Sequence, residues 1–130
     1  MTTNQCAHLI AGGFPPGSAA GHDMDYARLQ LLQKLQFEDQ LTVTVANDFQ
    51  DIERWLPGTD FLLTYVAGPY PEGAGNEALQ TWLEQGGRWF ALHGTSGGKA
   101  VKTEHEGRPV KKMIKAEHHR TLGCFFLNHP

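Results

Sequence analysis

Four short strand-like segments alternate along this chain with segments of helical character. The strand-like segments, which are apolar or alternate with β-branched residues, are residues 8–11, 41–45, 61–66 and 89–92. A helical segment follows each of the first three: one from residue 24, a short one over residues 49–56, and one from about residue 76. Strands joined by helical crossovers run parallel, with the helices packed on the faces of the sheet. The order predicts an α/β fold with a mainly parallel sheet covered on both faces.

The first and third helical segments carry recognisable start signals. Asp23 can act as the N-cap of the first, in which Ala27, Leu31 and Leu35 recur at a spacing of four and form one apolar face. For the third we expect Asn76 as the N-cap and the following Gly-Gly pair as the end.

The segment after residue 98 is harder to assign. Residues 99–115 are polar and basic, which favours a surface excursion, while residues 113–122 can form a helix and residues 124–127 a fifth strand. Three histidines of this region are expected on the solvated surface: His105, His118 and His119.

Length and composition exclude several classes of protein. With 130 residues we expect one domain spanning residues 1–130. The formal net charge of −3 and the isoelectric point of about 6.1 give no electrostatic reason to expect nucleic acid or an anionic membrane as partner. No apolar run approaches the roughly 20 residues of a membrane helix. Cys6 and Cys124 lie among apolar residues and are expected to be buried, reduced thiols of a cytoplasmic protein.

The fourth strand-like segment runs straight into a polar turn. Residues 89–92 are followed by His93, Gly94, Thr95 and Ser96, and then by two more glycines. Ligands of open α/β sheets bind at the carboxyl ends of the strands, where such a turn lies. The turn is therefore the first candidate for a functional site.

Three motifs together resemble the trehalose-utilisation (ThuA-like) family of the class I glutamine-amidotransferase-like superfamily. They are the Gly-Gly-Phe turn at residues 12–14 with His22 and Asp23, the Gly-Gly-Arg-Trp-Phe-Ala-Leu-His run at residues 86–93, and Leu122-Gly123 with Phe126 and His129-Pro130. They occur in the family's order and extend over nearly the whole chain. The resemblance implies a flavodoxin-like three-layer sandwich and a function in carbohydrate metabolism.

The chain departs from the family's pattern in two places. It carries extra residues at positions 15–21, and it ends at Pro130, where members of the family continue. We therefore expect a domain truncated at its C-terminus. The amidotransferase relatives also have a nucleophilic cysteine where this chain has His93, so amide hydrolysis by a Cys-His pair is not expected.

A parallel sheet would bring His22, His93 and His129 to one edge. Three imidazoles there could bind zinc, could act as general acid and base on a small polyhydroxylated ligand, or could only satisfy nearby backbone groups. The expected substrate-binding positions are those of the turn and of the neighbouring loops, with helix capping as the rival role of Asp23: Asp23, Tyr70, Gly94, Thr95 and Ser96.

Two further functions remain open, and one is not expected. Gly94 to Gly98 matches Gly-x-Ser-x-Gly, so Ser96 could be the nucleophile of a serine hydrolase, with Glu117 and His129 as partners. The chain could instead be a non-catalytic amidotransferase-like domain for binding or assembly, forming a homo-oligomer through an exposed sheet edge. Flavin is not expected, because the loop after the first strand offers two prolines and no hydroxyl before Ser18.

Overall fold

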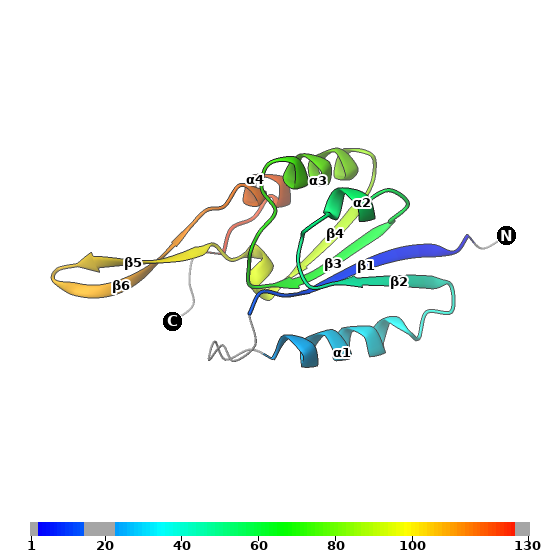
Figure 1. Ribbon diagram of the computed structural model, residues 1–130, viewed down its shortest axis with the longest axis horizontal. Helices are drawn as coiled ribbons and strands as arrows, with labels where there is room; N and C mark the ends of the chain where they lie inside the picture. The colour runs from blue at the N-terminus through cyan, green and yellow to red at the C-terminus, as the bar shows by residue number, and fades with distance from the viewer. Residues whose placement is uncertain (1–2, 15–22, 127–130) are drawn as a thin grey trace.

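Four parallel strands form the central sheet of the computed structural model, which describes residues 3–14 and 23–126 (Figure 1). Their order is β2-β1-β3-β4, with Leu9 of β1 paired to Val45 of β2 and to Leu63 of β3. The strands are β1 (Gln5–Gly12), β2 (Leu41–Ala46), β3 (Phe61–Val66) and β4 (Arg88–Leu92). The predicted α/β fold with a mainly parallel sheet is confirmed, and the third strand has the predicted bounds.

Helices lie on both sides of this sheet. Helix α1 (Met24–Leu35) lies on one face, and α2 (Ile52–Trp55) and α3 (Ala74–Glu84) lie on the other (Figure 1). The predicted cap of α1 is confirmed, since Asp23 accepts a hydrogen bond of 2.8 Å from the backbone N–H of Tyr26. No helix in the described part of the chain has the length and apolar character that a membrane span requires.

The predicted cap of α3 is wrong. The helix begins at Ala74, after Gly73 in a left-handed conformation, so Asn76 lies inside the first turn, where it is 6% exposed. Its side chain is used in tertiary contacts instead, because it donates to Glu117 at 3.2 Å and accepts from Thr121 at 2.8 Å. Because the buried amide of Asn76 is hydrogen-bonded to these two residues, it does not cap the helix.

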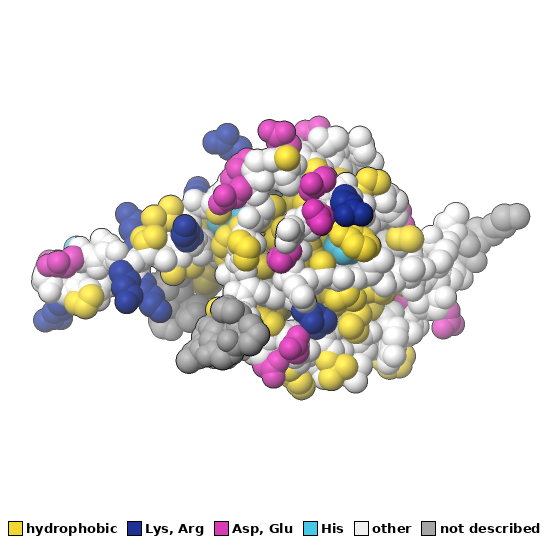
Figure 2. Space-filling view, viewed as in Figure 1, with side chains coloured by type: hydrophobic (Ala, Val, Ile, Leu, Met, Phe, Trp, Pro, Cys, Tyr) yellow, Lys and Arg dark blue, Asp and Glu magenta, His cyan; other side chains and the backbone are white. Residues whose placement is uncertain are grey.

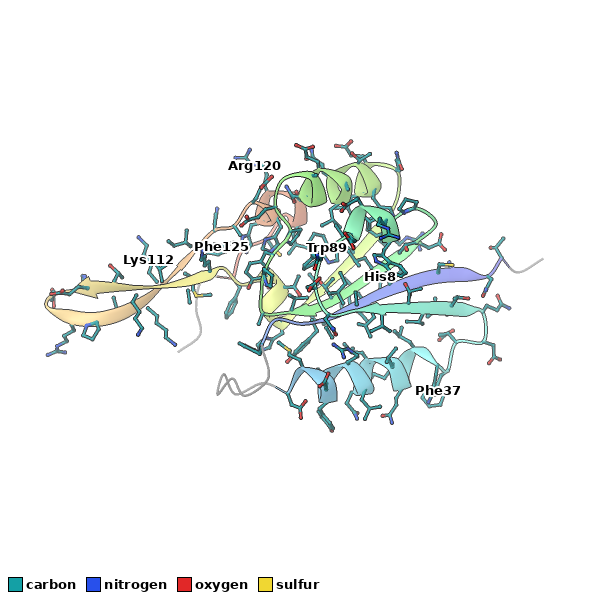
Figure 3. The ribbon with its side chains drawn as sticks, in the orientation of Figure 1. His8, Phe37, Trp89, Lys112, Arg120 and Phe125 are labelled. Atoms are coloured by element: carbon teal, nitrogen blue, oxygen red, sulfur yellow. The ribbon has the colours of Figure 1, made fainter. Side chains whose placement is uncertain are left out.

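The main hydrophobic core lies between the sheet and helices α2 and α3. Figure 3 shows Trp89 there, its ring between β4 and these helices. The buried members of the cluster are Ile10, Phe49, Ile52, Leu56, Leu62, Val66, Leu79 and Trp82. On the opposite face Leu9 and Leu63 are buried, but no residue of α1 is.

A two-stranded antiparallel hairpin projects from the carboxyl end of the sheet (Figure 1). It consists of β5 (Lys99–His105) and β6 (Arg108–Ile114), so the surface excursion predicted for residues 99–115 is confirmed and has a regular structure. The helix predicted over residues 113–122 is shorter than expected: α4 spans only His118–Leu122. Met113 and Ile114 pair with β5 instead.

The C-terminal segment differs from the prediction in two further respects. Of the predicted strand at 124–127, the described part makes only an isolated parallel bridge from Phe126 to Gly97. Cys124 is exposed and Cys6 is only partly buried, so the expectation of two buried thiols is wrong. The single backbone bridge leaves the side chain of Cys124 uncovered.

Candidate functional site

The turn after β4 places His93 at the carboxyl edge of the sheet. A short 3-10 helix, η1 (His93–Ser96), begins directly after Leu92, and His93 adopts a left-handed backbone conformation with φ of 49°. A residue other than glycine seldom takes this conformation, and such residues concentrate at functional sites. The sharp strand-to-turn geometry predicted for this segment is therefore present.

Three contacts within the protein fix this turn against β3 and the loop that follows it. The hydroxyl of Thr95 accepts a hydrogen bond of 3.1 Å from the N–H of Val66, and the hydroxyl of Tyr70 donates to the carbonyl of Gly94 at 2.8 Å. A Cβ atom on Gly94 would lie 2.7 Å from the carbonyl oxygen of Val66, so only glycine fits there. Thr95 is completely buried, which makes its side chain part of the support of the turn and not of the cavity wall.

A cavity of about 640 Å³ opens beside this turn. It lies between η1, the loop after β3 and the base of the hairpin, and its size is in the range of small-molecule sites. The polar side chains in its wall are those of Glu72, His93, Ser96 and Lys99. Most of the wall is apolar or aromatic, including Phe14, Met24, Pro69, Tyr70, Met113 and Phe126.

Two histidines of α4 hold the turn from behind, contrary to the expectation that they lie on the surface. His118 is 0% and His119 is 5% exposed. Nε2 of His118 lies 2.7 Å from the carbonyl oxygen of Thr95, and Nε2 of His119 lies 3.1 and 3.0 Å from those of Ser96 and Gly97. Three successive carbonyl groups of the turn are thus satisfied by two imidazoles.

These contacts indicate which nitrogen carries the proton when each ring is neutral. Carbonyl oxygens only accept hydrogen bonds, so the proton of each neutral ring is on Nε2. Nδ1 of His119 accepts from the N–H of Ala116 at 2.8 Å, whereas Nδ1 of His118 is buried without a partner. Burial lowers the pKa of His118, the contact with Thr95 raises it, and the neighbouring His119 lowers it further.

The aromatic side chains around these histidines form a continuous stack. The ring of Tyr70 lies 4.4 Å from that of His118 with an interplanar angle of 19°, and the two histidine rings are 4.1 Å apart. Phe125 covers the edge of His119 at 4.7 Å, and Figure 3 shows this ring beside the base of the hairpin. Tyr70, which lines the cavity, is therefore held on one face by a buried imidazole.

The structure brings together only some of the residues that the sequence indicated. His93, Gly94, Ser96 and Tyr70 line the cavity, and the expected partial exposure of Tyr70 is confirmed. Asp23 is exposed, caps α1 and does not line this cavity. His22 and His129 lie outside the described residues, so their convergence with His93 stays a prediction.

The Ser96 and zinc hypotheses both depend on His129, which lies outside the described residues. Ser96 donates its hydroxyl to the carbonyl of His93 at 3.1 Å, while the carboxylate of Glu117 accepts from the N–H of Gly73 at 3.0 Å and from Asn76. Glu117 is thus bound to α3 and not to a triad partner among the described residues. Among residues 3–14 and 23–126, no three side chains of His, Cys, Asp or Glu meet in a way that could hold a metal ion.

The burial of two histidines and the presence of three further residues at the cavity were not predicted from the sequence. His118 and His119 were read as part of a polar tail, although they stand between Ala116 and Leu122 in a segment with some helical character. Glu72, Lys99 and Met113 reach the cavity from loops and from the hairpin. No periodic pattern marks such positions, because loops and hairpin bases are placed by tertiary packing.

Comparison of the chain with protein-family models, with curated protein sequences and with solved structures finds no match. The class that fold and site define is accordingly an α/β protein with a cavity at the carboxyl edge of its parallel sheet.

Proposed function

We propose that this protein is a ThuA-like domain of flavodoxin-like, three-layer architecture that binds a small polyhydroxylated ligand in carbohydrate metabolism. The observation that carries the proposal is the position of His93, in a left-handed conformation at the end of β4 and in the wall of a 640 Å³ cavity. The sequence motifs that resemble the family point to the same strand and the same turn. Neither cysteine forms a disulfide, which fits a reducing compartment such as the cytoplasm.

The chemistry of the cavity wall supports a sugar-like ligand. A pyranose has apolar C–H faces and a rim of hydroxyl groups, so it needs aromatic or apolar walls together with hydrogen-bonding side chains. Tyr70 and Phe14 supply the first kind of surface, and Glu72, Ser96 and His93 supply the second. In this proposal the imidazole of His93 is the central polar group, because it can donate or accept a proton near neutral pH.

His22 and His129 complete the proposed site as further acid, base or hydrogen-bonding groups, and the three imidazoles could together serve as ligands of zinc. The motifs place His22 directly before the helix whose first residue, Met24, lines the cavity. The third histidine lies three residues beyond Phe126, which also lines it. These sequence distances are short enough to allow both imidazoles to reach the same region.

A second candidate is a binding domain without catalytic activity. The observation that favours it is the residue type at the turn, because His93 replaces the nucleophilic cysteine of the resembled superfamily and no thiol lines the cavity among the described residues. Binding without turnover of the ligand would distinguish this candidate from an enzyme.

The test is ligand binding by wild type and by His93→Asn. Asparagine tolerates the left-handed conformation, so the substitution removes the imidazole while keeping the turn. His105→Asn, at the exposed end of β5, is the matched control. Sugars and polyols that raise the melting temperature of wild type are then titrated by calorimetry, and we expect His93→Asn to weaken binding by about tenfold or more.

Three results separate the parts of this proposal. The absence of a thermal shift with every sugar at high concentration would overturn the ligand class, and equal binding by His93→Asn and wild type would overturn the site. Zinc analysis of tag-free wild type and His93→Asn tests the metal separately. Equal zinc content in the two proteins would remove His93 from any metal site.

A further inference from the structure

The hairpin carries a charge opposite to that of the rest of the chain. Residues 99–114 contain five of the eleven Lys and Arg residues and two of the fourteen Asp and Glu residues, a formal charge of +3. Because the whole chain has a formal charge of −3, the remainder carries −6. Figure 2 shows the basic side chains gathered on the hairpin, whereas acidic ones lie over α2 and α3. The modest net charge of the protein is therefore the sum of a positively charged hairpin and a negatively charged remainder.

No ion pair within residues 3–14 and 23–126 neutralises the cations of the hairpin. Lys102 and Lys111 are directly opposite each other in the β5–β6 register, and like charges in that position are destabilising. The two ion pairs of the described residues are Arg28–Asp25 and Arg54–Asp51, and neither involves the hairpin. Lys112 points into solvent (Figure 3). The arrangement suits an anionic surface on another molecule.

Apolar side chains are exposed on the same hairpin. Val110 is 38% and Ile114 is 46% exposed, and the register places both on the face that also carries Val101 and Lys112. A two-stranded hairpin is at best marginally stable in water by itself, and in the described part of the chain β5 and β6 pair with no other strand. Val110 lies between Arg108 and Lys112 on this face, and exposed apolar side chains beside cations favour a protein partner over the phosphates of a nucleic acid, which offer no apolar surface.

The side of the molecule formed by α2 and α3 has the complementary charge. Exposed carboxylates cluster on α2, on α3 and on the segment that precedes α3: Asp51, Glu53, Glu72, Glu77 and Glu84. Arg54 is the basic residue of α2, and it is already paired with Asp51. A contact between two hairpins would bring lysine against lysine, whereas a hairpin on the α2–α3 side would bring lysine against glutamate.

We propose that the hairpin of one copy of this chain binds the acidic α2–α3 side of a second copy, with Arg108 and Lys112, which share a face with Val110 and Ile114, as the central cations. Two copies related by a twofold axis would make the contact twice, which closes the assembly as a dimer. This inference is independent of the ligand proposed for the cavity.

The first measurement is the association state of wild type as a function of salt. Sedimentation velocity at ~50 mM salt should show a dimer that dissociates at ~500 mM, because salt screens contacts between exposed charges. The variant R108E/K112E should weaken dimerisation by about tenfold or more at low salt. The control K34E/R120E changes the net charge by the same amount, away from the hairpin, and should leave the dimer in place.

The second measurement identifies the contact. A carbodiimide, which joins lysine to carboxylate without a spacer, is applied to a mixture of isotopically light and heavy protein. Mixed-isotope crosslinks between hairpin lysines and the carboxylates of α2 and α3 are expected, and they remain informative for wild type even if R108E/K112E fails to fold. A monomer at low salt and ~200 μM overturns the proposal, as does a dimer unaffected by the double variant. Binding of an oligonucleotide or an anionic vesicle by the hairpin of a monomer would also overturn it.

Discussion

The two faces of the sheet are packed very differently. On the α2–α3 face, eight buried side chains form one continuous cluster. On the α1 face, Leu9 and Leu63 are buried, yet α1 contributes no buried residue and Leu29 in its middle is 49% exposed. Phe90 of β4 is paired with Leu63 and so points to this same side, where it is 54% exposed. The comparison indicates that most of the stability of the domain comes from one face.

The largest effect should follow from opening a cavity on the well-packed face. Leu79→Ala removes a completely buried side chain of α3, and we expect a loss of about 2–5 kcal/mol in the free energy of unfolding. Leu29→Ala removes the same atoms from α1 and should cost below about 1 kcal/mol, since half of that side chain is already in water. Urea unfolding of both variants measures the difference, and equal losses would refute the asymmetry.

Acid should destabilise the α2–α3 side selectively, because it contains both histidines whose pKa is lowered by burial. His8 is stacked on Trp55 of α2 (Figure 3), and His118 lies beneath the turn of the site. A folded-state pKa below the unfolded value of 6.5 means that the unfolded chain binds more protons as the pH falls. Stability is therefore full above pH 6.5 and decreases below it, by up to about 1.4 kcal/mol per pH unit for each group.

This expectation is checked by urea titrations at a series of pH values from neutral downward. His118→Asn should show a weaker decrease with falling pH than wild type, and His105→Asn should show the same decrease as wild type. A free energy of unfolding that does not change below pH 6.5 would mean that both rings are solvated.

An intermediate effect should follow from removing one hydrogen bond at the site. Tyr70→Phe deletes the hydroxyl that donates to the carbonyl of Gly94 while keeping the stack on His118. We expect a loss of about 0.5–1.5 kcal/mol in unfolding free energy. Retention of sugar binding by this variant would assign the ring of Tyr70, and not its hydroxyl, to the proposed ligand site.

The smallest effect is expected at the uncovered end of the α1 face. Phe90→Thr keeps a residue suited to a strand and removes an aromatic ring that is 54% exposed. The free energy of unfolding should change by less than about 0.5 kcal/mol. A loss comparable to that of Leu79→Ala, seen in the same urea experiment, would show that the ring is covered in solution.

The parallel sheet and the turn of the site could be predicted from the sequence because their signals are local. Phe61–Val66 is nearly all apolar, as a strand buried on both faces requires, and the glycines after His93 mark the sharp turn. The cap of α1 is equally local, because Asp23 accepts a hydrogen bond from the N–H of Tyr26, three residues later in the chain. These local patterns predict the structure correctly because no contact with a distant part of the chain overrides them.

The rest depended on contacts between residues far apart in the chain. His118 and His119 look like surface residues in the sequence, and their burial follows from the carbonyl groups of η1, which lie more than 20 positions earlier. The side chain of Asn76 leaves its capping role for Glu117, 41 positions away. The hairpin was not predicted, because its charged and β-branched residues suit a solvated strand and an irregular excursion equally well.

The base of the hairpin has a consequence for how the molecule could respond to association. Ala100 and Met113 face each other across β5 and β6, and both line the cavity beside His93. The base of the hairpin thus forms part of the cavity wall. A partner that displaces the hairpin on binding would also change the shape of the cavity, and with it the affinity for a ligand. Thermodynamic reciprocity then requires the ligand to change the affinity for that partner by the same factor.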